Sequence, residues 1–223
     1  NSIKMSLAEE NYLKALYHLI FEKEGQNEAR TIELANLLKV RPASVNDMLK
    51  KMKEKSLISN EKYGKIRLTK NGKKIAINII RKHRLWETFL YEKLDFTWGE
   101  VHDVAEQLEH IKSSKLVMKL DKFLSYPRFD PHGDPIPNEN GEIVKTNRVL
   151  LSSIKKGSFC RVVGVKDISS DFLTYIDDLN IRINSEIILE DIQEFDSTRL
   201  ISFNDKKNRI SKEVSESIYV IEL

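Results

Sequence analysis

The sequence has little cysteine and no long hydrophobic run. Cys160 is the only cysteine among 223 residues, which excludes an internal disulfide framework and favours a reducing, cytoplasmic environment. No apolar stretch approaches the roughly 20 residues that a membrane-spanning helix needs. The first residues also lack the apolar segment of a secretion signal. We therefore expect a cytoplasmic globular protein with no membrane partner.

Proline and glycine are scarce as well, with five and eight residues respectively. Four of the five prolines lie between residues 127 and 137, which predicts a loop or linker over 127–147 because proline interrupts helices and strands. Hydrophobic residues make up 40% of the chain and charged residues 32%, as is typical of globular proteins. The length suits two or three domains, and we expect them to span 1–75, 76–147 and 148–223.

The formal net charge of +3 is unevenly distributed. Residues 1–75 contain 16 Lys and Arg against 9 Asp and Glu, whereas the other two segments are each slightly acidic. Within 41–74 there are 11 basic and 3 acidic residues. Such a block is typical of DNA-binding proteins, because neutralisation of phosphates dominates their affinity. A solvated, lysine-rich helix surface is the alternative.

This basic block coincides with a recognisable order of elements. A capping box at Ser6–Glu9 begins one helix, Thr31 begins a second, and Pro42 begins a third, where its missing N–H does no harm. The β-like segments 57–61 and 65–69 then predict a hairpin. Together these elements predict a winged helix-turn-helix. Its expected contacts are to base edges from Pro42, Ala43, Ser44, Asn46 and Asp47, and to phosphates from Lys50, Lys51, Tyr63 and Lys65.

Further helices and then a β-rich tail follow. Thr69 is expected to cap a helix that runs to about Leu94, and a capping box at Thr97–Glu100 begins another that runs to about Ile111. A further helix ends before Pro127. From Arg148 onward, short β-branched and aromatic runs predict strands at 159–165, 181–183, 187–192, 200–203 and 219–223, with one helix over 170–179. The fold class is therefore mainly α with a small β domain, typical of a barrel.

Two of the predicted helices carry His and Glu where a buried face would be apolar. The spacing places each set on one helical face. Buried charge must be paired or bound to metal, and carboxylate with imidazole suits Mn(II), Fe(II), Zn(II) or Co(II). The pattern therefore predicts a metal site, with a solvent-exposed polar face as the alternative. The residues are His83 and Glu87 on the first helix, and His102, Glu106, Glu109 and His110 on the second.

Segments in order along the whole chain resemble the diphtheria-toxin-repressor and manganese-transport-regulator family. They are Glu10–Leu13, Arg81–Glu87, Val101–His110, Asp130–Pro137 and Asp178–Glu186. The resemblance implies a winged helix, a helical dimerisation domain with the metal sites, and a C-terminal FeoA-type (SH3-like) β-barrel. It also implies a homodimeric repressor that binds double-stranded operator DNA when loaded with Mn(II) or Fe(II), without enzymatic activity or a small-molecule substrate.

The resemblance also implies two metal sites. The first would use Glu106, Glu109 and His110 with the side chain of Asn11. The second would use His83, Glu87 and His102, completed by Asp171 or, as a weaker candidate, Ser169.

Three positions in or beside the first site distinguish this chain from parts of the family. Glu106 stands where iron-type members place Cys, and Asn11 stands where the family uses Met or Asp. Lys14 stands where the manganese-type site has a further Glu. The hard oxygen donors favour Mn(II) over Fe(II), while Zn(II) or Co(II) could bind in vitro.

Two other functions fit the same residues. A winged-helix regulator could keep the His/Glu groups as a structural cluster and bind DNA without metal. A metallohydrolase could use them to activate water, although no separate general base or nucleophile motif is visible. We expect His18 to be a helix-surface or core-edge residue and His132 a linker turn residue. We also expect a buried core thiol for Cys160, and packing roles for Trp86 and Trp98.

Overall fold

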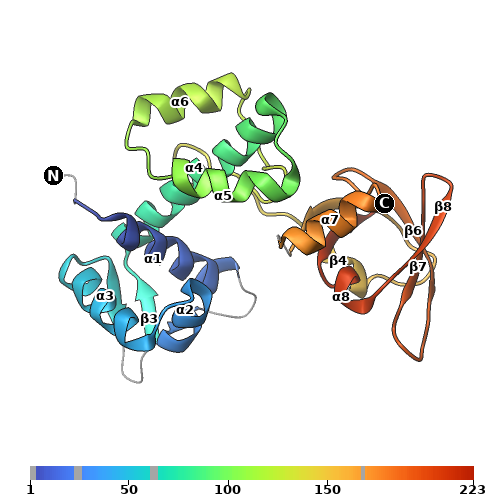
Figure 1. The fold of residues 1–223 in the computed structure, drawn as a ribbon, viewed down its shortest axis with the longest axis horizontal. Coiled ribbons are helices and arrows are strands. Elements are labelled where there is room, and N and C mark those ends of the chain that lie inside the picture. The colour runs from blue at the N-terminus through green and yellow to red at the C-terminus, as the bar shows by residue number, and fades with distance from the viewer. Residues whose placement is uncertain (1–3, 23–26, 61–64, 167–168) are drawn as a thin grey trace. The chain divides into compact units, whose positions relative to one another are not determined.

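The computed structural model describes residues 4–22, 27–60, 65–166 and 169–223. The chain divides into two compact units. Unit 1 comprises Asn1–His83, Glu106–Val117 and Pro137–Glu142, and unit 2 comprises Arg84–Ala105, Met118–Ile136 and Ile143–Leu223. Figure 1 follows the chain through the elements of both units.

Unit 1 begins with three helices. Helix α1 (Leu7–Tyr17) starts at the predicted capping box, in which the Ser6 hydroxyl accepts from the Glu9 N–H and the Glu9 carboxylate accepts from the Ser6 N–H. It continues as the π-helical turn η1 (His18–Glu22). Helix α2 (Thr31–Leu38) ends at Lys39, which is left-handed, and α3 (Pro42–Glu54) has proline in its first turn, as predicted.

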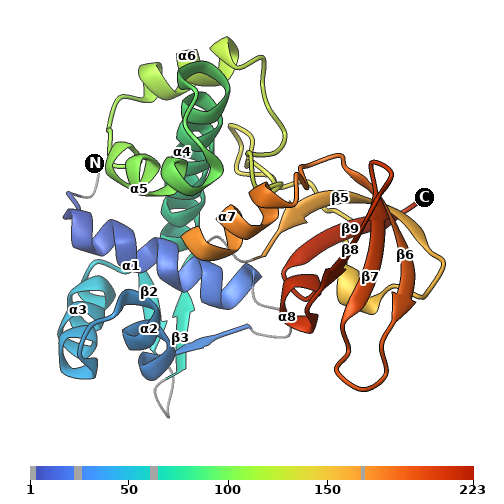
Figure 2. The same cartoon turned by 45° about the vertical axis from the view of Figure 1, so that its right-hand side comes forward.

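A small antiparallel sheet completes this part of unit 1. Strands β2 (Ile58–Asn60) and β3 (Lys65–Leu68) form the predicted hairpin, and β1 (Ala29–Arg30) pairs with the other edge of β3. Figures 1 and 2 show the sheet beside the three helices. The winged helix-turn-helix is therefore confirmed. Its core consists of Leu13, Leu16, Leu34, Val45, Leu49, Met52, Leu57 and Ile66, all buried.

Three further helices are α4 (Lys70–Leu94), α5 (Trp98–Leu108) and α6 (Ser114–Phe123). The Gly72 N–H donates to the Thr69 hydroxyl at 3.0 Å, so Thr69 caps α4 as predicted. The predicted end of α5 near Ile111 was wrong, since α5 ends at Leu108 and residues 109 and 110 form a turn. None of the described helices is long and apolar enough to cross a membrane.

Between α6 and strand β4 (Val149–Leu150) the described residues form the predicted loop, with one isolated bridge between Phe129 and Pro135. This loop is not simply solvated. The Asp130 carboxylate accepts from the backbone N–H groups of His132 and Asp134, each at 2.9 Å. Gly133 has φ +84°, and a Cβ there would lie 2.0 Å from the Val163 carbonyl oxygen. The loop therefore packs against strand β5 (Phe159–Val165) at a position that only glycine fits.

The C-terminal part of unit 2 is one antiparallel sheet in the order β4-β9-β5-β6-β7-β8. Its strands are β4 (Val149–Leu150), β5 (Phe159–Val165), β6 (Glu186–Ile192), β7 (Arg199–Phe203), β8 (Lys206–Ile210) and β9 (Ile218–Glu222). The remaining helical segments are η3 (Leu151–Ser153), α7 (Ser170–Asp178) and α8 (Lys212–Ser215). Figure 2 shows α7 and α8 next to this sheet.

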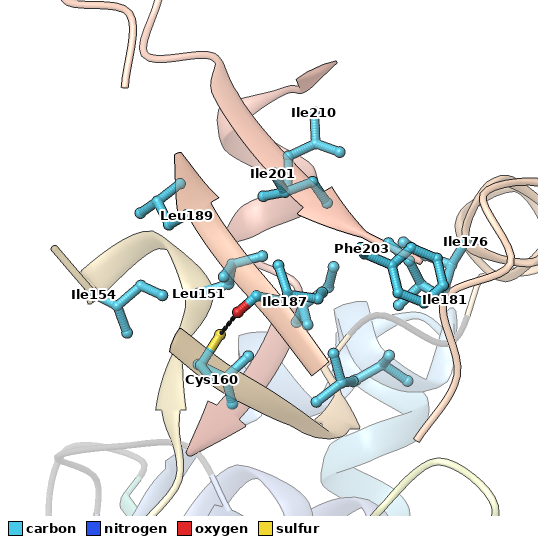
Figure 3. Packing of buried hydrophobic residues seen from close by; sticks show 14 of the residues in the cluster. Leu151, Ile154, Cys160, Ile176, Ile181, Ile187, Leu189, Ile201, Phe203 and Ile210 are labelled. Atoms are coloured by element: carbon cyan, nitrogen blue, oxygen red, sulfur yellow. Dashed lines mark hydrogen bonds between the residues drawn. The ribbon is translucent and has the colours of Figure 1, made fainter. Parts of the chain in front are cut away.

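The strand predicted at 181–183 was wrong. Asn180 and Asn184 are both left-handed, with φ of 59° and 72°, and this backbone conformation ends regular strand pairing on either side. Ile181 nevertheless packs in the apolar core of the sheet, drawn in Figure 3. Cys160 is buried in that core, where its thiol donates to the Ile187 carbonyl, which confirms the prediction for this residue.

Candidate metal centre and DNA-binding surface

A group of charged side chains, all buried except the exposed Glu106, joins α1, α4, α5 and the turn after α5 within unit 1. Oε2 of Glu109 lies 2.7 Å from Lys14 Nζ and 2.6 Å from His83 Nδ1. Lys14 Nζ also lies 3.1 Å from His83 Nδ1 and 3.6 Å from Glu106 Oε1. Since a carboxylate only accepts, both nitrogens donate to Glu109. We refer to these four residues as the Lys14 cluster.

Glu109 is the most enclosed member of the Lys14 cluster, with only 1% of its surface exposed. Burial acts to raise the pKa of its carboxyl group, but the hydrogen bond from His83 and the charge of Lys14 outweigh it. The pKa of Glu109 is therefore lowered below its usual value. Glu109 is thus an ionised oxygen donor at neutral pH, which is the form that binds a metal ion.

A second pair lies beside this cluster. His110 Nδ1 is 2.7 Å from Oε2 of Glu10, and His110 Nε2 is 4.0 Å from the other carboxylate oxygen of Glu109. Lys82 is buried nearby. Burial lowers the pKa of its ammonium group, and the charges of Glu10 and Glu109 oppose that shift. The two oxygens of Glu109 thus face different partners, Lys14 with His83 on one side and His110 on the other.

Glu10 was not among the residues predicted from the sequence. Glu10 and Lys14 are four residues apart on α1 and share the stripe of Tyr17, where a buried face would be apolar. The argument that identified the His and Glu faces of the later helices therefore applied here too. Of the predicted core ligands, Glu106, Glu109 and His110 lie in or beside the Lys14 cluster. Asn11 is exposed on α1, next to Glu10.

Unit 2 contains another buried set of potential ligands. Glu87, Asp130 and His132 each offer an atom within 4.8 Å of the others. Oε1 of Glu87 is 3.3 Å from His102 Nδ1, and its Oε2 is 3.8 Å from His132 Nδ1. His132 lies in a turn of the linker loop, as predicted, and it is also buried and faces Glu87. His83 lies one helical turn before Glu87 on α4.

The charges in this set are mutually compensating. Burial acts against a positive charge on His132, but its hydrogen bond and attraction to Glu87 outweigh burial and raise its pKa to about 9. Burial and the charges of Asp134 and Glu87 raise the pKa of Asp130, while Arg84 and His132 oppose the rise. His132 is therefore a cation near neutral pH that holds one oxygen of Glu87.

The C-terminal residues predicted to complete the second site have different positions. Asp171 is exposed in the first turn of α7. Ser169 is the N-cap of that helix, where its hydroxyl accepts from the Phe172 N–H. Capping accounts for Ser169 without a metal. His18 pairs with Glu22 on the surface of η1, as predicted.

The predicted DNA-contacting face of α3 is exposed along its length. Val45, Leu49 and Met52 point into the core, which leaves Pro42, Ala43, Ser44, Asn46, Asp47, Lys50 and Lys51 exposed. Lys65 on β3 pairs with Glu28. Tyr63, in the predicted hairpin turn, lies outside the described residues.

These features define a class of protein: a winged-helix, DNA-binding fold that carries buried carboxylate and imidazole donors. The donor chemistry fits a divalent ion that accepts oxygen and nitrogen ligands, because Glu109 is ionised and its second oxygen faces His110.

The comparisons with known proteins agree along the whole chain. Residues 4–66 match the iron dependent repressor N-terminal DNA binding domain, and residues 69–138 match the iron dependent repressor metal binding and dimerisation domain. Residues 149–222 match the FeoA domain.

Individual relatives extend this result. The diphtheria toxin repressor of Corynebacterium diphtheriae is 27% identical over 96% of both chains. The iron-dependent repressor IdeR of Mycobacterium tuberculosis is 30% identical over 81% of this chain and 83% of its own. A solved manganese-dependent transcriptional repressor in complex with manganese has a TM-score of 0.86 and 28% identity, over 96% of this chain and all of the other.

The chain belongs to the iron-dependent repressor family, a family of metal-dependent, DNA-binding transcriptional repressors. The relatives named above are repressors and not enzymes.

Proposed function

We propose that this protein is a cytoplasmic, homodimeric repressor that controls manganese or iron homeostasis and is activated by Mn(II) in preference to Fe(II). The observation that carries the proposal is the buried contact of α1 with Glu109 and His110. Helix α1 lies in the range that matches the DNA-binding domain, whereas Glu109 and His110 lie in the range that matches the metal-binding domain. Ligands in this position can make DNA binding depend on metal.

The core site would be held by Glu109 and His110, with Glu106 and Asn11 completing it and Glu10 as a further oxygen donor. A bound divalent ion would supply positive charge that neutralises these carboxylates and links α1 to the turn after α5. Because α1 is part of the winged helix, its contacts with Glu109 and His110 would then determine how the winged helix is oriented.

The ancillary site would use His83, Glu87, His102 and Asp171. Nδ1 of His83 donates to Glu109, so Nε2 is the ring nitrogen that would bind the metal. The hydrogen bond to Glu109 would hold the imidazole ring in the orientation for this. His132 acts in the same way on Glu87.

DNA contact is assigned to α3 and the hairpin. The contacts to base edges would come from Pro42, Ala43, Ser44, Asn46 and Asp47, and those to phosphates from Lys50, Lys51, Tyr63 and Lys65. A homodimer would present two α3 helices to successive major grooves, about 34–36 Å apart. Exposed apolar residues on α6 support self-association, since Met118 is 58% exposed and Phe123 62% exposed.

The preference for Mn(II) rests on the absence of sulfur from the donor set. Glu106 and Asn11 supply oxygens, and Mn(II) gains less from a thiolate than Fe(II) or Co(II) does. Zn(II) is expected to bind at least as tightly but to activate less well, because its tetrahedral preference suits this oxygen-rich set poorly. Glu106→Cys should shift half-maximal activation toward Fe(II) and Co(II). An unchanged ratio of Mn(II) to Fe(II) concentrations would refute the preference.

The function itself is tested with DNA selected from a random duplex library in the presence of Mn(II). We expect fluorescence anisotropy to show binding with Mn(II), loss of binding with chelator, and recovery with added Mn(II). His110→Gln should need a much higher Mn(II) concentration, whereas the exposed control His18→Gln should not.

The alternative of a metal-independent regulator has an observation in its favour, because the charge of Lys14 already neutralises Glu109 without any metal. Binding of the selected duplex that persists unchanged in chelator would identify a metal-independent regulator. Turnover of substrate with no DNA retention would identify a metallohydrolase.

A further inference from the structure

Lys14 lies where a cation would bind. Its ammonium group has three neighbours in the Lys14 cluster, at 2.7 Å from Glu109, 3.1 Å from His83 and 3.6 Å from Glu106. Its side chain is buried. Two carboxylate oxygens beside a buried positive charge form part of the surroundings that a metal ion has in a carboxylate site, whereas Nδ1 of His83 donates to Glu109 and is a neighbour of the ammonium only.

We propose that the Lys14 ammonium is a built-in cation of the metal centre, so that the core site takes only one divalent ion. The proposal rests on the proposed function, because it concerns the number of ions that the same site binds.

The geometry excludes an ion from the position of the ammonium. Metal–ligand distances to nitrogen and carboxylate oxygen are about 2.0–2.2 Å. An ion held jointly by Oε2 of Glu109 and Oε1 of Glu106 would compete for the place of Nζ, which lies 2.7 Å and 3.6 Å from these two oxygens. It would also meet the positive charge of Lys14 at short range with little solvent between them. Lys14 would have to leave its buried position before a second ion entered.

The division of Glu109 between its two oxygens indicates where the single ion binds. Oε2 is used by Lys14 and His83, whereas Oε1 is the oxygen that faces His110. His110 in turn contacts Glu10. The ion is therefore expected on the side of His110 and Glu10, away from Lys14.

The balance of charge agrees with one ion. Glu10, Glu106 and Glu109 are opposed by the ammonium groups of Lys14 and Lys82, and both lysines interact with Glu109. One divalent ion already overcomes the remaining negative charge. A second would add to an excess of positive charge in a buried site, which is unfavourable.

The experiment counts Mn(II) bound to the full chain. The background carries Glu87→Gln and His102→Gln, which removes ancillary donors and leaves the Lys14 cluster intact. Equilibrium dialysis against Mn(II) gives the number of ions per chain, and electron paramagnetic resonance detects exchange coupling between two neighbouring Mn(II) ions. Circular dichroism checks the fold of each variant.

With Lys14 present we expect one Mn(II) per chain and an uncoupled spectrum. Lys14→Glu replaces the cation by a ligand and should bind two ions with a coupled spectrum. Lys14→Gln, which offers a neutral oxygen and avoids an added buried charge, should bind a second ion more weakly. Lys14→Arg keeps the cation and should stay at one.

Two ions bound with Lys14 present would overturn the inference, as would one ion in both Lys14→Glu and Lys14→Gln. No ion bound by any variant, or by the chain without substitutions, would overturn the proposed function and this inference with it.

Discussion

Removal of the Glu109 carboxylate should destabilise the packing of α1 even when no metal is present. Glu109→Ala removes the 2.7 Å partner of the buried Lys14 ammonium, which keeps only the exposed Glu106 at 3.6 Å, and removes the carboxylate that accepts from Nδ1 of His83. Breaking a buried ion pair by removing one partner typically costs about 3–5 kcal/mol, because an uncompensated charge remains. We expect a loss of this size in the local stability of α1.

The reasoning predicts that a second substitution recovers much of that loss. Lys14→Met removes the charge and keeps the length of the side chain. Lys14→Met with Glu109→Ala should therefore be more stable than Glu109→Ala alone, and the double-mutant cycle should give a coupling of about 2–3 kcal/mol. Hydrogen exchange of the α1 amides, measured in metal-free protein by mass spectrometry, reports the free energy of local opening. The strands β5 and β9 in unit 2 provide an internal control.

Two results would refute this account. One is a Glu109→Ala variant whose α1 amides exchange as slowly as those of the unsubstituted chain. The other is a coupling between Lys14 and Glu109 that is indistinguishable from zero, which would mean that solvent screens the pair despite its burial.

Three further predictions concern other parts of the chain. Burial raises the pKa of the Cys160 thiol to about 11 from its usual 9.0. The protonated thiol therefore stabilises the folded state fully below pH 9, and this contribution declines as the pH rises toward 11. A thiol reagent should modify Cys160 at pH 8 only after denaturation. Gly133→Ala should lower the free energy of unfolding by on the order of 3 kcal/mol or more, because of its steric clash, and Gly157→Ala by about 1 kcal/mol. Both glycines have φ near +85°, but of the two only Gly133 approaches another backbone. Urea titration followed by tryptophan fluorescence compares the two variants, and equal losses would contradict the close contact. Lys51→Ala should weaken binding to all duplexes alike and reduce the slope of log affinity against log salt by about 1, whereas Ser44→Ala should alter sequence preference.

The sequence was sufficient for elements whose ends carry local signals. The capping box at Ser6, the proline at the start of α3 and the threonine before α4 each act within one helical turn, so sequence spacing alone locates them. Strand β5 was predicted at its observed bounds because its β-branched run is central in the sheet and buried.

Elements that depend on distant partners were not predictable in this way. Strand β8 is a polar segment, Lys206–Ile210, that becomes a strand by pairing along β7. Strand β1 has two residues and exists only through its pairing with β3. The run at 181–183 has strand-like residues, but left-handed asparagines on both sides make it a turn. In each case the tertiary partner, and not the local sequence, decides the conformation.

The candidate sites were also predictable where local spacing decides and not where distant contacts decide. Helical spacing identified His83, Glu87, His102 and Glu106 as members of common faces. It could not show that Lys14 would reach Glu109 from a helix 95 residues away. Nor could it show that His132, in a loop rich in proline, would be buried against Glu87. Loop composition predicts irregular backbone, but exposure depends on what packs over the loop.

The presence of Lys14 also bears on how strongly metal and DNA can be coupled. Under the proposed function an ion favours the DNA-binding orientation by linking α1 to Glu109 and His110, and DNA must then tighten ion binding by the same factor. An ion can shift this equilibrium only by the difference between its affinities for the two states. Lys14 already supplies part of the link between α1 and Glu109 in the metal-free chain. The ion adds only the part through His110 and Glu10, so its effect on DNA affinity is smaller than it would be if a ligand replaced Lys14.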